Sequence, residues 1–123
     1  MVQRIGIESL KQLKRGNLKS NATCFVKFYS QGCHYCHTLK DYFINVADDY
    51  SDRDDLHFFA FNVDDVDNLD KVLSINGVPT IASFKGGPSR KVKINILDDP
   101  ETPNEKTWYF VKDLSLIHIS EPT

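Results

Sequence analysis

The sequence lacks the features that mark several large classes of protein. No apolar run approaches the roughly 18 residues that a membrane-spanning helix needs. Lys plus Arg (15) and Asp plus Glu (17) nearly balance, so there is no basic excess of the kind that nucleic-acid-binding domains carry. The start, residues 1–6, lacks the apolar core of a secretory signal. We therefore expect a cytoplasmic protein that binds neither membranes nor nucleic acid.

Cysteine is scarce, and its odd count does not suit a disulfide framework. The three cysteines are Cys24, Cys33 and Cys36. The composition is otherwise that of a globular domain, with 41% hydrophobic and 26% charged residues. A chain of 123 residues can build its own core, so we expect one domain over residues 1–123 that needs no metal or other cofactor. Residues 115–123 resemble translated sequencing-adapter read-through, and no function is assigned to this tail.

The charge is unevenly distributed along the chain. Residues 1–27 carry six basic side chains and one acidic one, Glu8. Residues 41–70 carry ten aspartates and one basic side chain, Arg53. The acidic stretch is interpreted either as a solvated face or as a docking face for a basic partner, and both interpretations stay open.

Hydrophobic periodicity divides the chain into alternating helices and strands. Helices are expected at residues 7–15, 36–50, 68–74 and 106–119, and strands at residues 24–29, 56–63, 80–85 and 90–96. The predicted order is α-β-α-β-α-β-β-α. Because the strands first alternate with helices and then form a hairpin, we expect an α/β fold with a central mixed four-stranded β-sheet flanked by helices on both faces.

The residues best suited to carry out a reaction lie between a predicted strand and a predicted helix. Cys33 and Cys36 are spaced so that they face the same way at a helix start and can form a disulfide. Free N–H groups and the helix dipole lower the pKa of the first cysteine, which favours the attacking thiolate. The second cysteine is placed to resolve a mixed disulfide. The same spacing is compatible with zinc, with a cluster shared between two chains, and, through His37, with haem attachment.

The sequence resembles the thioredoxin family over roughly residues 22–97. The matching segments are residues 25–29, 33–36, 61–64, 75–80 and 84–87. The resemblance implies a thioredoxin-like fold and disulfide exchange without a cofactor. It also implies that Pro79 is a cis-proline beside the cysteines, and that the backbone of Val78 holds an extended substrate strand. Gly77 is expected to allow close approach of that substrate.

Departures from the family pattern bear on the reduction potential. Gly32 stands where the family usually has tryptophan, and His34 and Tyr35 replace the usual Gly-Pro pair. Lys27 matches a position where many thioredoxins have a buried aspartate, and Ala60 matches that aspartate's lysine partner. Cationic His34 and Lys27 near the thiolate would make the couple more oxidising, with Tyr35 as a further tuning residue. Alternatively, His34 is solvated and Lys27 extends to water.

We predict from these residues a thiol–disulfide oxidoreductase that is less reducing than a typical thioredoxin. Cys33 attacks and Cys36 resolves, while Cys24 is a buried, inert thiol. The expected partners are protein disulfide substrates and a reductase or glutathione as electron source, and the protein is expected to be a monomer. The alternative is a non-catalytic thioredoxin-fold module that binds proteins. The intact cysteine pair argues against it, because a scaffold has no need of two spaced thiols.

Overall fold

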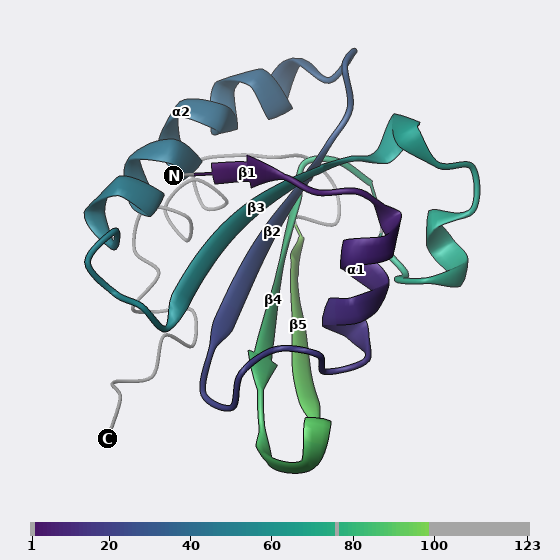
Figure 1. The fold of residues 1–123 in the computed structure, drawn as a ribbon. Helices are drawn as coiled ribbons and strands as arrows, with labels where there is room; N and C mark the ends of the chain where they lie inside the picture. The colour runs from purple at the N-terminus through teal and green to yellow at the C-terminus, as the bar shows by residue number, and fades with distance from the viewer. Residues whose placement is uncertain (1, 76, 99–123) are drawn as a thin grey trace.

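The computed structural model describes residues 2–75 and 77–98, with the backbone alone at 34, 35, 37–39, 90 and 95–98 (Figure 1). The strands are β1 (Val2–Arg4), β2 (Thr23–Tyr29), β3 (Leu56–Asn62), β4 (Thr80–Gly86) and β5 (Val92–Asp98). The α-helices are α1 (Ile7–Lys14) and α2 (His34–Asp49), and short 3₁₀ turns lie at Val63–Asp65, Leu69–Lys71 and Pro88–Arg90. Among these residues no helix has the length and apolar character needed to cross a membrane.

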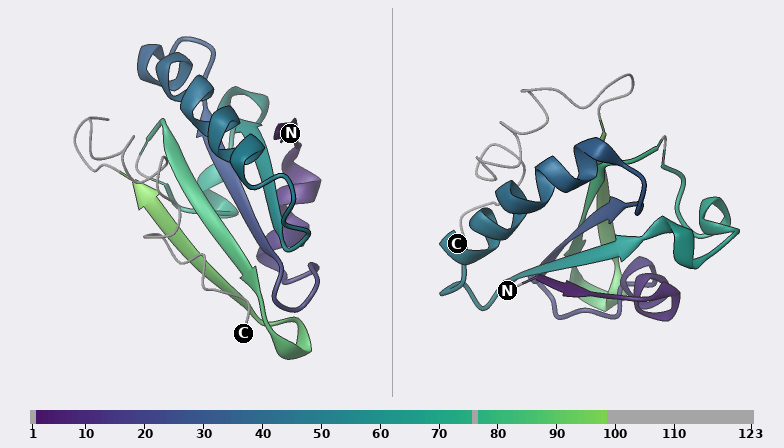
Figure 2. Two further views of the ribbon diagram at one scale, coloured as in Figure 1. Left: turned by 90° about the vertical axis from the view of Figure 1, so that its left-hand side faces the viewer. Right: turned by 90° about the horizontal axis from the view of Figure 1, so that it is seen from above.

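The sheet is mixed and has the strand order β1-β3-β2-β4-β5. β1 and β2 each run parallel to β3, β4 is antiparallel to β2, and β5 is antiparallel to β4. Parallel strands need crossover connections, and here α1 lies between β1 and β2, and α2 between β2 and β3. The views in Figure 2 show α1 on one face of the sheet and α2 on the other. The predicted α/β architecture with helices on both faces is confirmed.

The face of the sheet beneath α1 is closed by apolar side chains. The helix contributes Leu10 and Leu13, which lie one turn apart on its inner side. The buried cluster consists of Leu10, Leu13, Cys24, Val26, Phe28, Phe61, Leu69, Leu73, Ala82 and Phe84. Cys24 is 5% exposed, as predicted, and burial raises the pKa of its thiol to about 11.

The face beneath α2 has a smaller apolar cluster. Its members are Phe25, Phe43, Val46, Ala47, Leu56, Phe58 and Ile81. Strand β2 supplies both faces, because successive side chains point to opposite sides, so that Phe25 faces α2 and Val26 faces α1. Six of the seven residues of β2 are buried, which suits its place at the centre of the sheet.

The prediction of four strands is wrong by one edge strand. The additional strand is β1, in which Val2 to Arg4 pair with residues 58–60 of β3. Its three residues are too few to show the alternation by which a strand is recognised in a sequence.

The helix expected at residues 68–74 is also wrong, because only the 3₁₀ turn Leu69–Lys71 forms there. Asn68 provides no side-chain cap, and a seven-residue helix without a cap does not repay the cost of nucleation. Leu69 and Leu73 instead anchor the segment in the α1-side cluster. The strand expected at 90–96 starts later, at Val92, because Pro88–Arg90 forms a turn. The helix expected at 106–119 and the tail 115–123 lie outside the described residues.

Candidate active site

Cys33 and Cys36 form a disulfide at the N-terminus of α2. Their Cα atoms lie 5.2 Å apart, within the range that a disulfide spans. Cys33 is the N-cap residue of the helix, and its Sγ accepts a hydrogen bond from the backbone N–H of Cys36 at 3.0 Å. No acidic side chain lies in the first turn of α2, so the helix dipole acts on Cys33 without an opposing carboxylate there. This environment stabilises a thiolate at Cys33 when the disulfide is reduced.

The two cysteines differ in their access to solvent. Cys33 is half-buried, whereas Cys36, one turn into the helix, is 3% exposed. Cys33 is therefore the sulfur that an external disulfide reaches more easily. Cys36 is placed behind it, where it contacts the interior of the protein.

The strand register brings Pro79 to the same end of the sheet as the cysteines. Thr80 pairs with Phe28 near the end of β2, and the loop leading to Cys33 follows that strand directly. Pro79 precedes Thr80, and the Val78–Pro79 peptide bond is cis. The chain thus brings together segments that are more than forty residues apart in sequence.

The three residues predicted to shape a substrate groove have different surroundings. Pro79 is buried, Val78 is half-buried and Gly77 is exposed. Gly77 has a φ of 143°, a backbone conformation that favours glycine. No described atom lies within 4 Å of the position of a Cβ at Gly77, so backbone conformation, rather than close packing in the chain, requires glycine there. The hydroxyl of Thr80 donates a hydrogen bond to the carbonyl oxygen of Gly77 at 2.6 Å and fixes this turn.

The loop before Cys33 is held by Asp64. The carboxylate of Asp64 accepts a hydrogen bond from the backbone N–H of Gln31 at 3.1 Å. The side chain of Asn62 in turn accepts from the backbone N–H of Asp64 at 2.9 Å. The contact joins the end of β3 to the approach to Cys33. The sequence gives no signal for it, because it connects residues 33 positions apart.

Lys27 is buried in the α2 face of the sheet and does not extend to bulk water, since it is only 5% exposed. Its ammonium lies 5.5 Å from the ring centroid of Tyr29 and 5.6 Å from that of Phe43. Burial is the main cause that lowers the pKa of Lys27 to about 8, with a further lowering by Lys40 and an opposing effect of Asp41. The alternative in which Lys27 snorkels to solvent is therefore wrong.

A cavity of about 330 Å³ connects Lys27 with the disulfide. Its lining includes Cys36 and the cations Arg4, Lys27 and Lys40. The sequence pointed to Lys27, but not to Arg4 or Lys40, whose place beside Cys36 depends on the strand pairing and on the helix turn. The predicted tuning residues His34 and Tyr35 lie in the first turn of α2, and their side chains are outside the described part of the structure.

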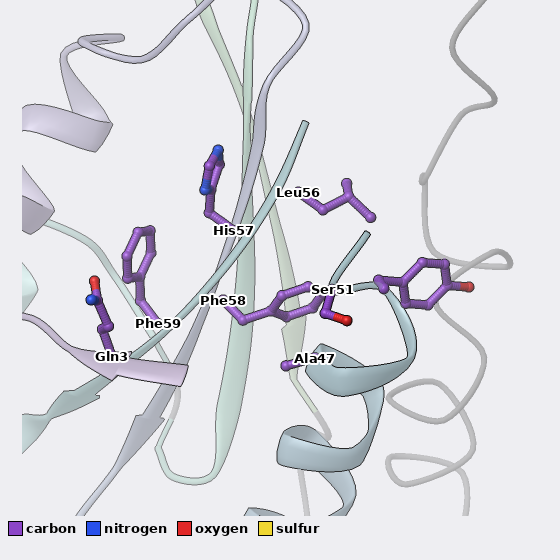
Figure 3. A pocket seen from close by; sticks show the side chains of 8 residues that line it. Gln3, Ala47, Ser51, Leu56, His57, Phe58 and Phe59 are labelled. Carbon is purple, nitrogen blue, oxygen red and sulfur yellow. The ribbon is translucent and has the colours of Figure 1, made fainter. Parts of the chain in front are cut away.

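A second cavity, of about 230 Å³, lies at the sheet edge beside β1 (Figure 3). Leu56 and Phe58 point to one side of β3, while His57 and Phe59 point to the other. This cavity has no cysteine in its lining and is separate from the disulfide. Among the described residues, no group of three or more His, Cys, Asp or Glu side chains is arranged to hold a metal ion. The disulfide and the cavity behind it are therefore the arrangement with the clearest chemistry.

Comparison with known sequences connects this geometry to one family. The family model for thioredoxin matches residues 9–101. The chain is 32% identical over 80 residues to a thioredoxin of Acidithiobacillus ferridurans, which covers 65% of this chain and 72% of that protein. It is 31% identical over 91 residues to a thioredoxin of Mycoplasma genitalium, covering 74% and 85%. It is also 35% identical over 68 residues to mouse protein disulfide-isomerase A2, covering 55% of this chain but only 12% of that protein.

Solved structures show the same fold. Chloroplastic thioredoxin z superposes with a TM-score of 0.61 at 19% identity, covering 94% of this chain and 95% of that one. The J-Trx1 fragment of ERdj5 superposes with a TM-score of 0.67 at 18% identity, covering 98% and 52%. At these identities the likeness establishes the fold and not the details of the site.

Proposed function

The chain belongs to the thioredoxin family of thiol–disulfide oxidoreductases, and from this premise we propose that Cys33 is its attacking thiolate and Cys36 its resolving thiol. One observation carries the assignment of roles. Cys33 is the more accessible sulfur and caps α2, whereas Cys36 is buried behind it. The accessible cysteine at the helix end has the environment that stabilises a thiolate.

The proposed reaction transfers two electrons between the protein and a substrate disulfide. The Cys33 thiolate attacks one substrate sulfur, the substrate S–S bond breaks, and the second substrate sulfur leaves as a thiolate. Cys36 then loses its proton and attacks Cys33 Sγ. The mixed disulfide breaks, the substrate leaves as a dithiol, and the Cys33–Cys36 disulfide forms. The same steps in reverse oxidise a dithiol substrate.

The loop before β4 is the proposed substrate groove. Val78 is half-buried beside the end of β2, so its backbone groups are placed to hold an extended substrate segment near Cys33. Pro79 is buried and shapes the floor of the groove, and exposed Gly77 leaves space for the substrate.

The couple is proposed to be less reducing than that of a typical thioredoxin, with His34, Tyr35 and Lys27 as tuning residues. What supports this is the cation at Lys27, which shares a cavity with Cys36 and, among the described residues, forms no ion pair with a carboxylate. A positive charge beside the thiols stabilises the thiolate and therefore the reduced form.

Equilibration of the protein in glutathione buffers measures the reduction potential of the Cys33–Cys36 couple. A value between about −230 and −120 mV supports the proposal, and a value near roughly −270 mV contradicts it.

Thioredoxin-family proteins act on protein disulfides, and we extend this to the partners of the chain. A reductase or glutathione supplies the electrons, and the protein works as a monomer in the cytoplasm. The presence of a buried, unpaired Cys24 supports a reducing compartment. Reduction of the oxidised protein by glutathione alone, followed by thiol titration, distinguishes the two electron sources. Sedimentation of the same sample tests the monomer.

Substitution of the two cysteines tests their roles separately. Cys33→Ser is expected to reduce turnover of a disulfide-bonded protein, such as insulin, to the uncatalysed rate. Cys36→Ser is expected to keep the first attack and to accumulate the mixed disulfide, which mass spectrometry detects. Cys24→Ser is the matched control, and it should turn over the substrate as the parent does without accumulating a mixed disulfide. Turnover retained in Cys33→Ser, or a trapped adduct on Cys36 in that variant, contradicts the assignment.

A further inference from the structure

The cavity behind Cys36 is formed by one row of the sheet and one stripe of α2. In the sheet, Arg4 pairs with Ala60 and Ala60 pairs with Lys27, so the three residues lie side by side across β1, β3 and β2. From the helix, Cys36 and Lys40 line the cavity one turn apart, followed by Ile44 after a further turn. The space exists because the small side chain of Ala60 stands between two long cationic ones.

The charges around this cavity are unbalanced. Lys27 is only 5% exposed, and its ammonium lies 5.5 Å and 5.6 Å from the ring centroids of Tyr29 and Phe43. Among the described residues, its ammonium is in none of the side-chain hydrogen bonds or ion pairs. Lys40 adds a second cation and disfavours the charged form of Lys27. Arg4 is different, because its guanidinium is already held by both carboxylate oxygens of Asp65, each at 2.8 Å.

We propose that this cavity binds a small oxyanion between the ammonium groups of Lys27 and Lys40, directly behind Cys36. The proposal goes beyond the disulfide exchange proposed above, since binding does not require turnover. A buried ammonium without a hydrogen-bonding partner is costly, and an oxyanion supplies both a counter-charge and acceptor oxygens. The volume of about 330 Å³ accepts a group of the size of phosphate or a short carboxylate.

The position of the site gives it a consequence for the disulfide. An anion beside Lys27 cancels the positive charge that favours a thiolate. The oxidised protein, whose sulfurs carry no charge, is therefore expected to bind the anion more tightly than the reduced protein. Because this coupling is reciprocal, a tenfold ratio of affinities would lower the reduction potential by about 30 mV. This second consequence rests on the proposed redox function, whereas the binding itself does not.

Binding is also expected to weaken as the pH rises through about 8, where Lys27 loses its charge. The other ionisable groups facing the cavity are Arg4 from β1, Tyr29 from β2, and Cys36 and Lys40 from α2. Asp41, beside Lys40, and Asp65, which holds Arg4, are the acidic groups nearby. Titration of Lys27 therefore removes one of the three cationic side chains that line the cavity, Arg4, Lys27 and Lys40.

The experiment is a titration of the oxidised 123-residue protein with inorganic phosphate at pH 7, in which amide chemical shifts report binding. Sodium chloride keeps the ionic strength constant, so that screening does not imitate binding. Saturable shifts at the backbone amides of Lys27, Cys36 and Lys40 are expected. A parallel titration with acetate shows which class of anion the site prefers. Saturation by either anion supports the site, and the ratio of the two affinities distinguishes a phosphate site from a carboxylate site.

Variants locate the site and make the proposal refutable. Lys27→Met keeps the volume and apolar stem of the side chain, and is expected to weaken binding by about tenfold or more. Lys40→Gln is expected to weaken it less, because Lys40 is exposed. Lys14→Gln, an exposed lysine of α1 on the other face of the sheet, is the matched control and should bind as the parent does. Shifts that do not saturate with either anion, or saturable shifts that persist in Lys27→Met, overturn the proposal. Since the disulfide form is used throughout, neither result depends on catalytic activity.

Discussion

The two faces of the central sheet are built from the same strands and yet differ in what they bury. On the α1 side, Val26 and Phe28 of β2 join a continuous apolar cluster. On the α2 side, Phe25 joins an apolar cluster at one end of the sheet, whereas Lys27 lines a cavity that reaches the disulfide. The α1 face therefore serves mainly stability, and the α2 face combines stability with chemistry.

The difference shows how one strand can serve both purposes. Because side chains alternate across a strand, replacement of an apolar residue on the α2 side leaves the α1 side unchanged. β2 can thus carry a buried cation at Lys27 while Val26 and Phe28, its neighbours in sequence, remain in a closed core. The buried ammonium of Lys27 lowers the stability of the fold from the α2 face, and the closed apolar core on the α1 face offsets this loss.

The largest expected difference between the faces concerns their phenylalanines. Phe28, on the α1 side, and Phe43, on the α2 side, are both fully buried. Phe28→Ala is expected to lower the free energy of unfolding by about 3–5 kcal/mol, the usual cost of such a truncation in a closed core. Phe43→Ala is expected to cost less, because the vacated space lies beside Lys27 and water that enters there solvates the ammonium.

Urea denaturation of both variants in the oxidised state measures this difference directly. Phe25→Ala is a useful third variant, since Phe25 lies on the α2 side but in its apolar cluster, against Phe58. Its cost should match that of Phe28→Ala. Equal losses in Phe28→Ala and Phe43→Ala would remove the distinction between a closed and an open face.

The apolar part of this comparison could be predicted from the sequence. Periodicity located α1, α2 and four strands, because each is long enough to repeat its burial pattern. The strand-to-helix context likewise identified Cys33 and Cys36. β1 and the 3₁₀ turn at Leu69 could not be predicted from hydrophobic periodicity, because an element of three residues is too short to show a period.

The polar part was predictable only in part. The sequence identified Lys27 as a departure from the family pattern. Whether its side chain is buried or reaches water depends on which residues cover the α2 face, and this could not be predicted. Arg4 and Lys40 reach the cavity through strand register and helix phase, and the contact of Asp64 with Gln31 joins two loops. Such contacts between distant segments leave no local pattern in a sequence.

The next effect in size is on stability at Lys27. Lys27→Met removes a buried ammonium without a hydrogen bond and is expected to raise the free energy of unfolding by about 1–3 kcal/mol at pH 7. The pKa of Lys27 is lowered in the folded protein to about 8 from an ordinary 10.5. Between these two values the unfolded chain keeps the Lys27 proton that the folded chain has lost. The contribution of Lys27 to the parent's stability therefore rises with pH across that range by about 1 kcal/mol per unit.

Chemical denaturation of the parent and of Lys27→Met from pH 7 to 10 tests this directly. The two stabilities should converge as the pH approaches 10.5, because the ammonium is then lost in both states. Lys14→Met, at an exposed position of α1, is the control and should show no such convergence. A constant difference between parent and Lys27→Met at all pH values would mean that Lys27 has an ordinary pKa.

The smallest expected effect comes from Cys24 and has the opposite sign. Burial on the α1 face raises the pKa of this thiol from 9.0 to about 11, so the unfolded chain loses its proton first. The contribution of Cys24 to the parent's stability therefore falls as the pH rises between these values. The loss is about 1 kcal/mol between pH 9 and 10, which offsets much of the gain due to Lys27. Cys24→Ala, with the disulfide kept oxidised, should remove the downward slope and expose the full upward one. If Cys24→Ala instead leaves the pH dependence unchanged, the thiol is not shielded from water, and the α1 face is less closed than its apolar cluster implies.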